Sequence, residues 1–212
     1  SVVRENAVLR NTYFLLGLSL LCSALTSTLF LMYPMPINPL LSMGIMFGLF
    51  FAVQATAHSA AGIIATFAFT GYMGYALGPI LHLAVYGFAN GPELVATTAL
   101  CVGTIFVGLS GYIATTKQEL SYLGGTLFSL LLSVIILSFA GMFFQIPFLI
   151  LVVNALSVLV FSGLIMYHTS EIIHGGETNY ILANISLYLA LLNLFVSVLR
   201  IMMMFAGNQN RD

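Results

Sequence analysis

Charge is what this sequence has least of. Lysine, arginine, aspartate and glutamate make up 5% of the 212 residues, whereas ordinary soluble domains carry roughly 25%. A water-soluble chain of this length needs a charged, solvated surface, and five basic and six acidic side chains cannot provide one. Because 60% of the residues are hydrophobic, the sequence predicts an integral membrane protein.

The near-neutral charge and the scarcity of cysteine exclude further classes. A net charge of −1 gives no reason to expect nucleic acid or an anionic surface as a partner. Cys22 and Cys101 both lie inside apolar runs and match neither a metal-binding spacing nor a disulfide framework. We therefore expect two buried structural thiols.

Patterns of catalytic chemistry are also missing. The sequence has no Ser/His/Asp set with a nucleophile elbow and no phosphate-binding loop. No carboxylate pair lies inside an apolar segment, which argues against a proton-driven transporter, because such a transporter needs protonatable groups near the bilayer midplane. We expect no enzyme, no cofactor and no small-molecule substrate.

Proline, glycine, asparagine and charged residues divide the chain into apolar segments. A membrane-spanning helix needs ~20 mostly apolar residues at about 1.5 Å rise each. We expect an all-α integral membrane protein with one seven-helix domain over residues 12–206, a cytoplasmic tail over 1–11 that is incomplete because the chain starts at Ser1, and a short tail over 207–212. The seven segments are 12–33, 38–57, 61–86, 93–115, 120–143, 147–168 and 180–206.

The basic residues predict the orientation in the membrane. Arg4 and Arg10 precede the first segment, and Lys117 lies between the fourth and fifth. The opposite loops hold no lysine or arginine before Arg211. By the positive-inside rule, the N-terminus is expected in the cytoplasm and the C-terminus on the outer side.

Glycines line one face of the third segment, which contains "FAFTGYMGYALGPILH". Gly71, Gly74 and Gly78 recur at spacings of three and four, and His82 follows on nearly the same face. Small residues at this spacing are typical of close backbone approach between helices in lipid. Pro79 removes one backbone hydrogen bond and predicts a kink.

One face of the last segment is small and polar. Spacings of three and four put six residues in one row: Ala183, Ser186, Ala190, Asn193, Ser197 and Arg200. We expect this row to face inward and the apolar side chains to face outward. Asn193 lies near mid-membrane and is expected to hydrogen-bond another helix, and lining a polar cavity is the alternative.

Arg200 is a cation inside an apolar segment. It lies about 30 Å along a helix from Tyr180, which matches the thickness of the hydrocarbon core. Its side chain is therefore expected to extend to the outer interface. Lining a central cavity is the alternative, because charged residues inside membrane segments tend to be functional.

Four ionisable residues gather in "HTSEIIHGGETNY" (168–180). His168, Glu171, His174 and Glu177 follow one another at spacings of three, at the expected cytoplasmic end of the sixth segment. His168 and Glu171 continue a row of that segment: Asn154, Ser157, Phe161 and Leu164. The cluster thus marks the cytoplasmic mouth of whatever lies between the last two segments.

Three roles for this cluster stay open. His168, Glu171 and His174 could bind a metal, although their spacing spreads them widely around a helix. Two histidines and two glutamates could instead form a pH-sensitive gate. The cluster could also simply build the loop between two helices. In that case Gly175 and Gly176 end one helix, and Thr178 or Asn179 caps the next.

Several stretches together resemble the Bax inhibitor-1 (TMBIM) family of membrane proteins. They are "VLRNTYFLLGLSL", "FAFTGYMGYALGPIL", "YIATTKQELSYLGG", "EIIHGGETNYILANISLYLALLNLFVSVL" and the terminal "RD". The resemblance covers nearly the whole chain, from about Val8 to Asp212.

The resemblance implies a function that composition does not show. Bacterial proteins of this kind bind the membrane-anchored AAA+ protease FtsH and its partners HflK and HflC in the inner membrane. They are slow substrates that modulate the protease, which engages a cytoplasmic N-terminal tail. In this sequence the tail would contain Arg4, Glu5 and Arg10. The polar cluster, on the expected cytoplasmic side, could form part of the contact surface.

The wider family also includes calcium-leak channels gated by pH through two aspartates, one on each of the last two helices. The matching positions in this sequence are His168 and Ala190, so the carboxylate pair is missing. Two neighbouring carboxylates can share a proton and respond to pH, and this pair cannot. A pH-sensitive calcium or ion leak therefore remains the alternative function, with Glu171 as a partial substitute.

Overall fold

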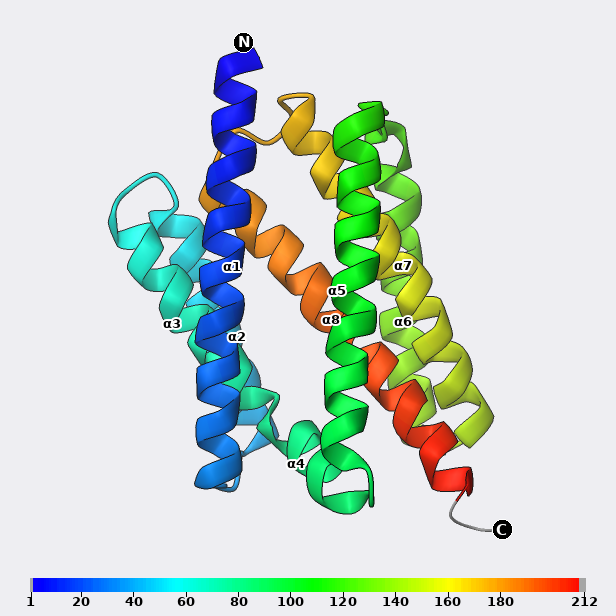
Figure 1. Cartoon of the computed structure of the whole chain (residues 1–212). Coiled ribbons are helices and arrows are strands. Elements are labelled where there is room, and N and C mark those ends of the chain that lie inside the picture. Colours follow the sequence, from blue (N-terminus) through cyan, green and yellow to red (C-terminus); the bar gives the residue numbers. More distant parts are fainter. Residues whose placement is uncertain (1, 210–212) are drawn as a thin grey trace. The chain divides into compact units, whose positions relative to one another are not determined.

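The computed structural model describes the backbone of residues 2–209 and the side chains of residues 6–207. The predicted tail residues Arg4 and Glu5, and also Arg211, have side chains outside this described part. Within it the chain is helical and has no β-strand (Figure 1). The helices are α1 (Val2–Met32), α2 (Pro39–Thr56), α3 (Ala61–Ala76), α4 (Gly78–Gly87), α5 (Gly91–Thr116), the 3₁₀ turn η1 (Ser121–Leu123), α6 (Gly124–Phe144), α7 (Pro147–Ile173) and α8 (Tyr180–Gln209).

Seven stretches of the described residues are long and apolar enough to cross a membrane, which confirms the predicted all-α, seven-span class. The ends of two helices differ from the prediction. The first helix begins at Val2, so most of the predicted tail of residues 1–11 is helical, because that stretch contains neither glycine nor proline. The sixth predicted segment continues from 168 to Ile173, so His168 and Glu171 lie on α7.

The predicted kink at Pro79 is an interruption of the helix. One apolar stretch, Ala61–Gly87, is divided into α3 and α4 at Leu77. The Leu77 N–H still donates to the Met73 carbonyl (3.1 Å), and the Leu81 N–H donates to the Leu77 carbonyl (3.1 Å). Proline has no N–H to donate between these two bonds, so the helix is broken there.

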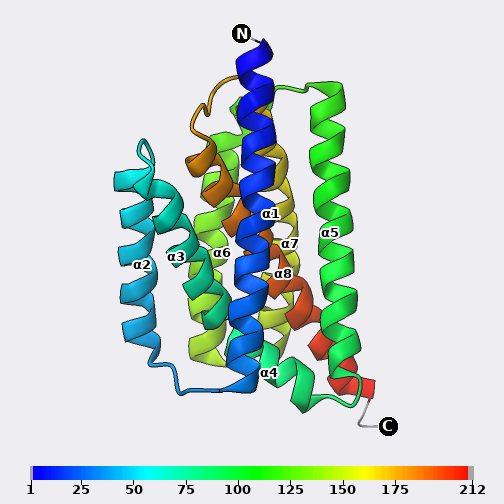
Figure 2. The ribbon, with the colours of Figure 1, turned by 60° about the vertical axis from the view of Figure 1, so that its left-hand side comes forward.

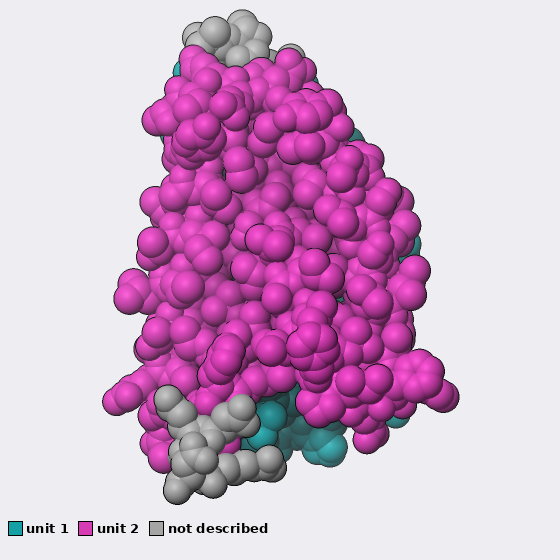
Figure 3. All heavy atoms as spheres, turned by 90° about the vertical axis from the view of Figure 1, so that its right-hand side faces the viewer, with its two compact units in different colours: residues 1–83, 175–188 teal, residues 84–174, 189–212 magenta. Residues whose placement is uncertain are grey.

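The chain forms two compact units, coloured separately in Figure 3. Residues 1–83 and 175–188 make the first unit, and residues 84–174 and 189–212 make the second. Helix α8 therefore begins in the first unit and ends in the second. In the first unit α3 packs against both α1 and α2, and in the second α7 packs against both α5 and α6 (Figure 2).

Gly71 and Gly74 of α3 and Gly78 of α4 lie against α1. A Cβ atom added to Gly74 would overlap the backbone of Ser23, and one added to Gly78 would overlap the ring of Phe30. At Gly71 an added Cβ would lie 3.4 Å from the Cys22 Sγ atom. Lipid tails are as apolar as leucine, so burial from water does not hold these helices against α1. Close packing at the glycines does.

Replacing Gly74 by alanine should therefore destabilise the first unit. The added methyl group would push against backbone that cannot move aside, at a cost of about 1–3 kcal/mol. Gly48 in α2 is the matched control, because nothing lies within 4 Å of its added Cβ. Thermal unfolding in mild detergent should show a lower midpoint for Gly74→Ala and an unchanged or higher one for Gly48→Ala. Equal midpoints would contradict the role of Gly74.

Candidate functional site

The predicted polar cluster is divided between the two units. His168, Glu171 and His174 belong to the second unit, whereas Glu177 belongs to the first. His168 and Glu171 are half-buried on α7, and His174 is exposed at its C-terminal end. Among the described side chains, no three His, Cys, Asp or Glu residues are arranged to hold a metal ion.

His174 and Ser170 fasten the loop between α5 and α6 to the end of α7. The Ser170 hydroxyl donates to the Gln118 carbonyl (2.9 Å) and accepts the Leu120 N–H (2.9 Å). The His174 Nε2 atom lies 3.0 Å from the Lys117 carbonyl oxygen, and its Nδ1 atom lies 2.9 Å from the Ser170 carbonyl oxygen. We call these contacts the loop clasp.

The loop clasp holds a backbone conformation that costs energy. Lys117 ends α5 with φ 52°, in the left-handed region, which is unfavourable for a non-glycine residue by roughly 1–2 kcal/mol. Both ring nitrogens of His174 face carbonyl oxygens, which accept hydrogen bonds and do not donate them. A neutral imidazole has one N–H and can satisfy one of these carbonyls, whereas a protonated ring can satisfy both.

The other half of the cluster builds the start of α8. The Asn179 side-chain oxygen accepts the N–H groups of Ile181 (2.9 Å) and Leu182 (3.3 Å), which confirms one of the two predicted N-cap residues. Glu177 accepts the N–H of Asn179 (2.8 Å), and Gly175 has φ 76° directly after the end of α7. His174 and Glu177 thus both have roles in loop construction.

The same asparagine ties α8 to the turn between α2 and α3. Its side-chain amide donates to the Ala57 carbonyl (2.9 Å) and lies 3.3 Å from the Nδ1 atom of His58. All these residues belong to the first unit. Asn179 therefore helps to hold the α2–α3 turn, a contact that its position in the sequence does not predict.

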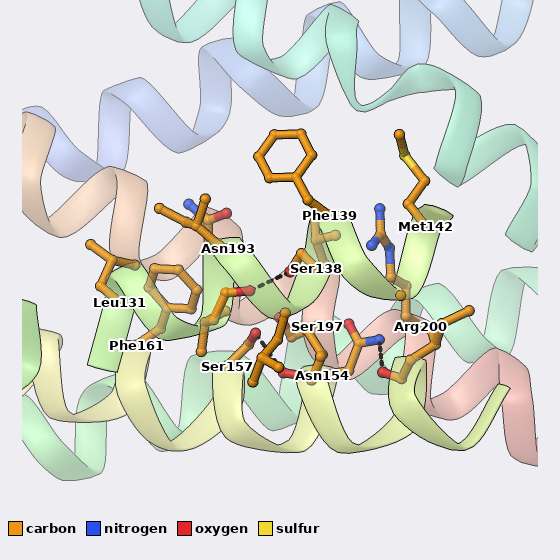
Figure 4. Close-up of a pocket in the computed structure, with 17 residues that line it drawn as sticks. Leu131, Ser138, Phe139, Met142, Asn154, Ser157, Phe161, Asn193, Ser197 and Arg200 are labelled. Atoms are coloured by element: carbon orange, nitrogen blue, oxygen red, sulfur yellow. Dashed lines mark hydrogen bonds between the residues drawn. The ribbon is translucent and has the colours of Figure 1, made fainter. Parts of the chain in front are cut away.

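A pocket in the second unit collects much of the predicted polar row. It has a volume of about 520 Å³, and its lining comes from α6, α7 and α8 (Figure 4). Asn193, Ser197 and Arg200 of the row line it, together with Asn154 and Ser157 of α7. The remaining polar member of the row, Ser186, is half-buried in the first unit.

Two expectations for α8 differ from the structure. The Asn193 amide donates to the Leu189 carbonyl of its own helix (2.8 Å) and not to another helix. The apolar side chains do not all face outward, since Leu187, Leu194 and Leu199 are fully buried. Helix α8 has the largest buried share of the seven spans. Its side chains are therefore packed on several sides, and the helix does not have a single inward face.

The first unit also contains a buried polar cluster that was not predicted from the sequence. The Ser23 Oγ atom lies 2.7 Å from the Tyr188 hydroxyl and donates to the Thr70 carbonyl (2.8 Å). The Asn184 amide donates to the Ser19 hydroxyl (3.2 Å), and both residues are fully buried. Asn184 and Tyr188 stand one helical turn apart on α8, a spacing that could have indicated a second polar face.

Comparisons with known proteins agree with this architecture. A family model described as inhibitor of apoptosis-promoting Bax1 matches residues 5–207. The modulator of FtsH protease YccA from Escherichia coli K12 is 45% identical over 100% of this chain and 94% of its own length. An uncharacterized protein of Pseudomonas aeruginosa is 42% identical (96% and 91% covered), and an uncharacterized membrane protein of Vibrio cholerae is 39% identical (97% and 93% covered).

Removing the Ser170 hydroxyl should open the loop clasp. Ser170→Ala leaves the buried Leu120 N–H and the Gln118 carbonyl without this partner, which should lower the free energy of unfolding by about 1–3 kcal/mol. Ser133→Ala is the control, because that exposed hydroxyl bonds to its own helix. Hydrogen–deuterium exchange should become faster at Leu120 in Ser170→Ala and stay unchanged in Ser133→Ala. Unchanged exchange in both variants would show that the clasp does not hold the loop.

Proposed function

Because the chain belongs to the Bax inhibitor-1 family, we propose that it modulates a membrane-anchored AAA+ protease of the FtsH type by binding to it. The observation that carries the proposal is the 45% identity to the E. coli modulator of FtsH protease, which spans this whole chain and nearly all of that relative. In this proposal the protein acts by binding and performs no catalysis of its own. It works in the inner membrane, where the name of a second E. coli relative, inner membrane protein YccA, places that protein.

The seven spans support a role as a slow substrate of that protease. An AAA+ protease degrades a membrane protein by pulling it out of the bilayer. The seven spans are helical, and exposing their backbone N–H and C=O groups to hydrocarbon during extraction would cost several kcal/mol per group. Such a chain occupies the protease for a long time, and HflK and HflC would share the complex. We also propose that the protease engages the N-terminal tail with Arg4, Glu5 and Arg10, of which Arg10 is exposed on α1.

The contact surface we propose is the polar end of α7 with the neighbouring loop. Lys117, Glu119 and His174 are exposed there, and Glu171 is half-buried. Exposed charges steer and orient a partner more than they add affinity, which suits a transient complex with a soluble ATPase domain. The loop clasp keeps this surface in one shape.

A pull-down tests both the partner and the surface. Tagged protein extracted in mild detergent from E. coli membranes should co-purify FtsH together with HflK and HflC, as judged by mass spectrometry. Replacing all four residues of the polar cluster with glutamine should reduce the amount of recovered protease several-fold. These residues are His168, Glu171, His174 and Glu177. Glu93→Gln is the control, since Glu93 is exposed at the opposite end of α5.

The pull-down distinguishes a failure of the proposed contact surface from a failure of the proposed modulator role. Recovery of FtsH that is unaffected by the fourfold replacement would overturn the proposed surface and leave the modulator role standing. Absence of the protease from the wild-type sample would overturn the modulator role itself.

The orientation of the chain is a further part of the proposal. With the N-terminus in the cytoplasm and seven spans, the C-terminus lies in the periplasm. Alkaline phosphatase fused after residue 212 should then be active, because it folds in the oxidising periplasm, whereas a fusion after Lys117 should be inactive. The reverse pattern would place the polar surface on the wrong side for a cytoplasmic ATPase.

An ion leak is the weaker alternative. The position on α7 where a gating carboxylate would be expected holds His168, and the position on α8 holds the buried Ala190. Neither supplies a carboxylate that could share a proton. Purified protein in liposomes should therefore show no acid-dependent calcium flux.

A further inference from the structure

The pocket of the second unit combines an apolar lining with one cation. Its volume of about 520 Å³ lies within the range of small-ligand pockets, roughly 300–1,000 Å³. Leucine, isoleucine, valine, phenylalanine and methionine side chains form most of its wall, and Arg200 supplies its one charge. We propose that this pocket binds an anionic phospholipid, with one acyl chain along the apolar wall and the phosphate on Arg200.

Most polar side chains that line the pocket donate hydrogen bonds within their own helices. Four of them donate to the carbonyl group four residues earlier: Ser138 to Val134, Asn154 to Ile150, Ser157 to Val153 and Asn193 to Leu189. Donors used in this way do not need water in the pocket. The lining therefore suits a hydrocarbon chain better than a file of waters or ions.

Arg200 lies at the end of the pocket where a headgroup would sit. Figure 4 shows it beside Met142, with Leu131 and Phe161 at the opposite end. Met142 and Ile150, which also line the pocket, are within about one helical turn of the turn that joins α6 to α7. That turn must reach the interface, because irregular backbone is not tolerated in contact with lipid tails. The opposite end lies deeper in the bilayer.

Among the described residues, no acidic side chain lines the pocket to neutralise Arg200. The Arg200 side chain is exposed to the pocket and its surroundings. A cation at the edge of hydrocarbon is costly unless an anion or water solvates it. Guanidinium groups bind phosphate through paired hydrogen bonds, so a phospholipid phosphate is the complementary partner.

The rim allows a lipid to enter from the side. Phe139 is 63% exposed, Met142 is 73% exposed and Ile135 is 43% exposed, so α6 presents the pocket edge at the surface of the second unit. An acyl chain can slide in from the bilayer without any helix opening. A phospholipid is favoured over a soluble anion, because the pocket needs an apolar chain as well as a charge.

Native mass spectrometry tests the site directly. The full chain in mild detergent is mixed with equal amounts of phosphatidylglycerol and phosphatidylcholine that carry identical acyl chains. The wild-type protein should retain phosphatidylglycerol preferentially. Arg200→Gln should lower that retention about tenfold, because it removes a charge-assisted pair. Ser138→Phe, which fills the pocket from an exposed position, should lower it similarly.

Two controls match these variants. Ser133→Phe adds the same ring to an exposed serine of α6 that bonds to its own helix but does not line the pocket. Arg10→Gln removes an exposed arginine of α1 that does not line the pocket. Both should retain phosphatidylglycerol as the wild-type protein does.

Several results would overturn the proposal. One is equal retention of the two lipids by the wild-type protein. Another is phosphatidylglycerol retention that stays unchanged in both Arg200→Gln and Ser138→Phe. A third is a loss of retention in the two controls that equals the loss in these variants. A fatty acid or a second copy of the chain held at this site in place of phosphatidylglycerol would also overturn it. If Arg200→Gln fails to fold, Ser138→Phe decides the question, because it replaces an exposed serine and leaves the arginine in place.

Discussion

Hydrocarbon offers no hydrogen bonds, so a polar group within the spans is costly unless it finds a partner. Most of the local detail in this structure follows from that constraint. Serine and threonine side chains along the helices donate to the carbonyl group one turn earlier, as Thr66 does to Gly62 and Thr98 to Leu94. Such bonds satisfy the hydroxyl without requiring a second helix, so these residues can occupy apolar helices at little cost.

Where a polar group does reach another element, it fixes the fold of a unit. Tyr188 and Ser23 join α8 to α1, and both bond to the Thr70 carbonyl of α3. Ser170 and His174 join α7 to the loop after α5. Interhelical bonds of this kind contribute roughly 0.6–2 kcal/mol each, and more importantly they select one register among helices that are otherwise uniformly apolar. The glycines that face α1 allow the close approach that these bonds need.

The same constraint separates structural residues from candidate functional ones. The sequence left binding, gating and loop roles open for His174 and Glu177, yet both use their polar atoms at a helix end or in a loop. Arg200 differs, because no described residue that lines its pocket is an anion. A partner protein at the exposed α7 end and a lipid at Arg200 would occupy different parts of the second unit, so protease binding and lipid binding can be examined separately.

The sequence by itself determined the class and the number of spans, because length, hydropathy and helix-breaking residues act locally along the chain. It also indicated the interruption near Pro79, the cap at Asn179 and the glycine face, since each follows from the spacing of a few residues. Only the tertiary structure decided which polar residues meet. Asn193 bonds to its own helix, Tyr188 meets Ser23 across the first unit, and the polar row of α8 divides between the two units. The physical reason is that α8 is buried on several faces, so the periodicity of its sequence cannot show which neighbour each side chain contacts.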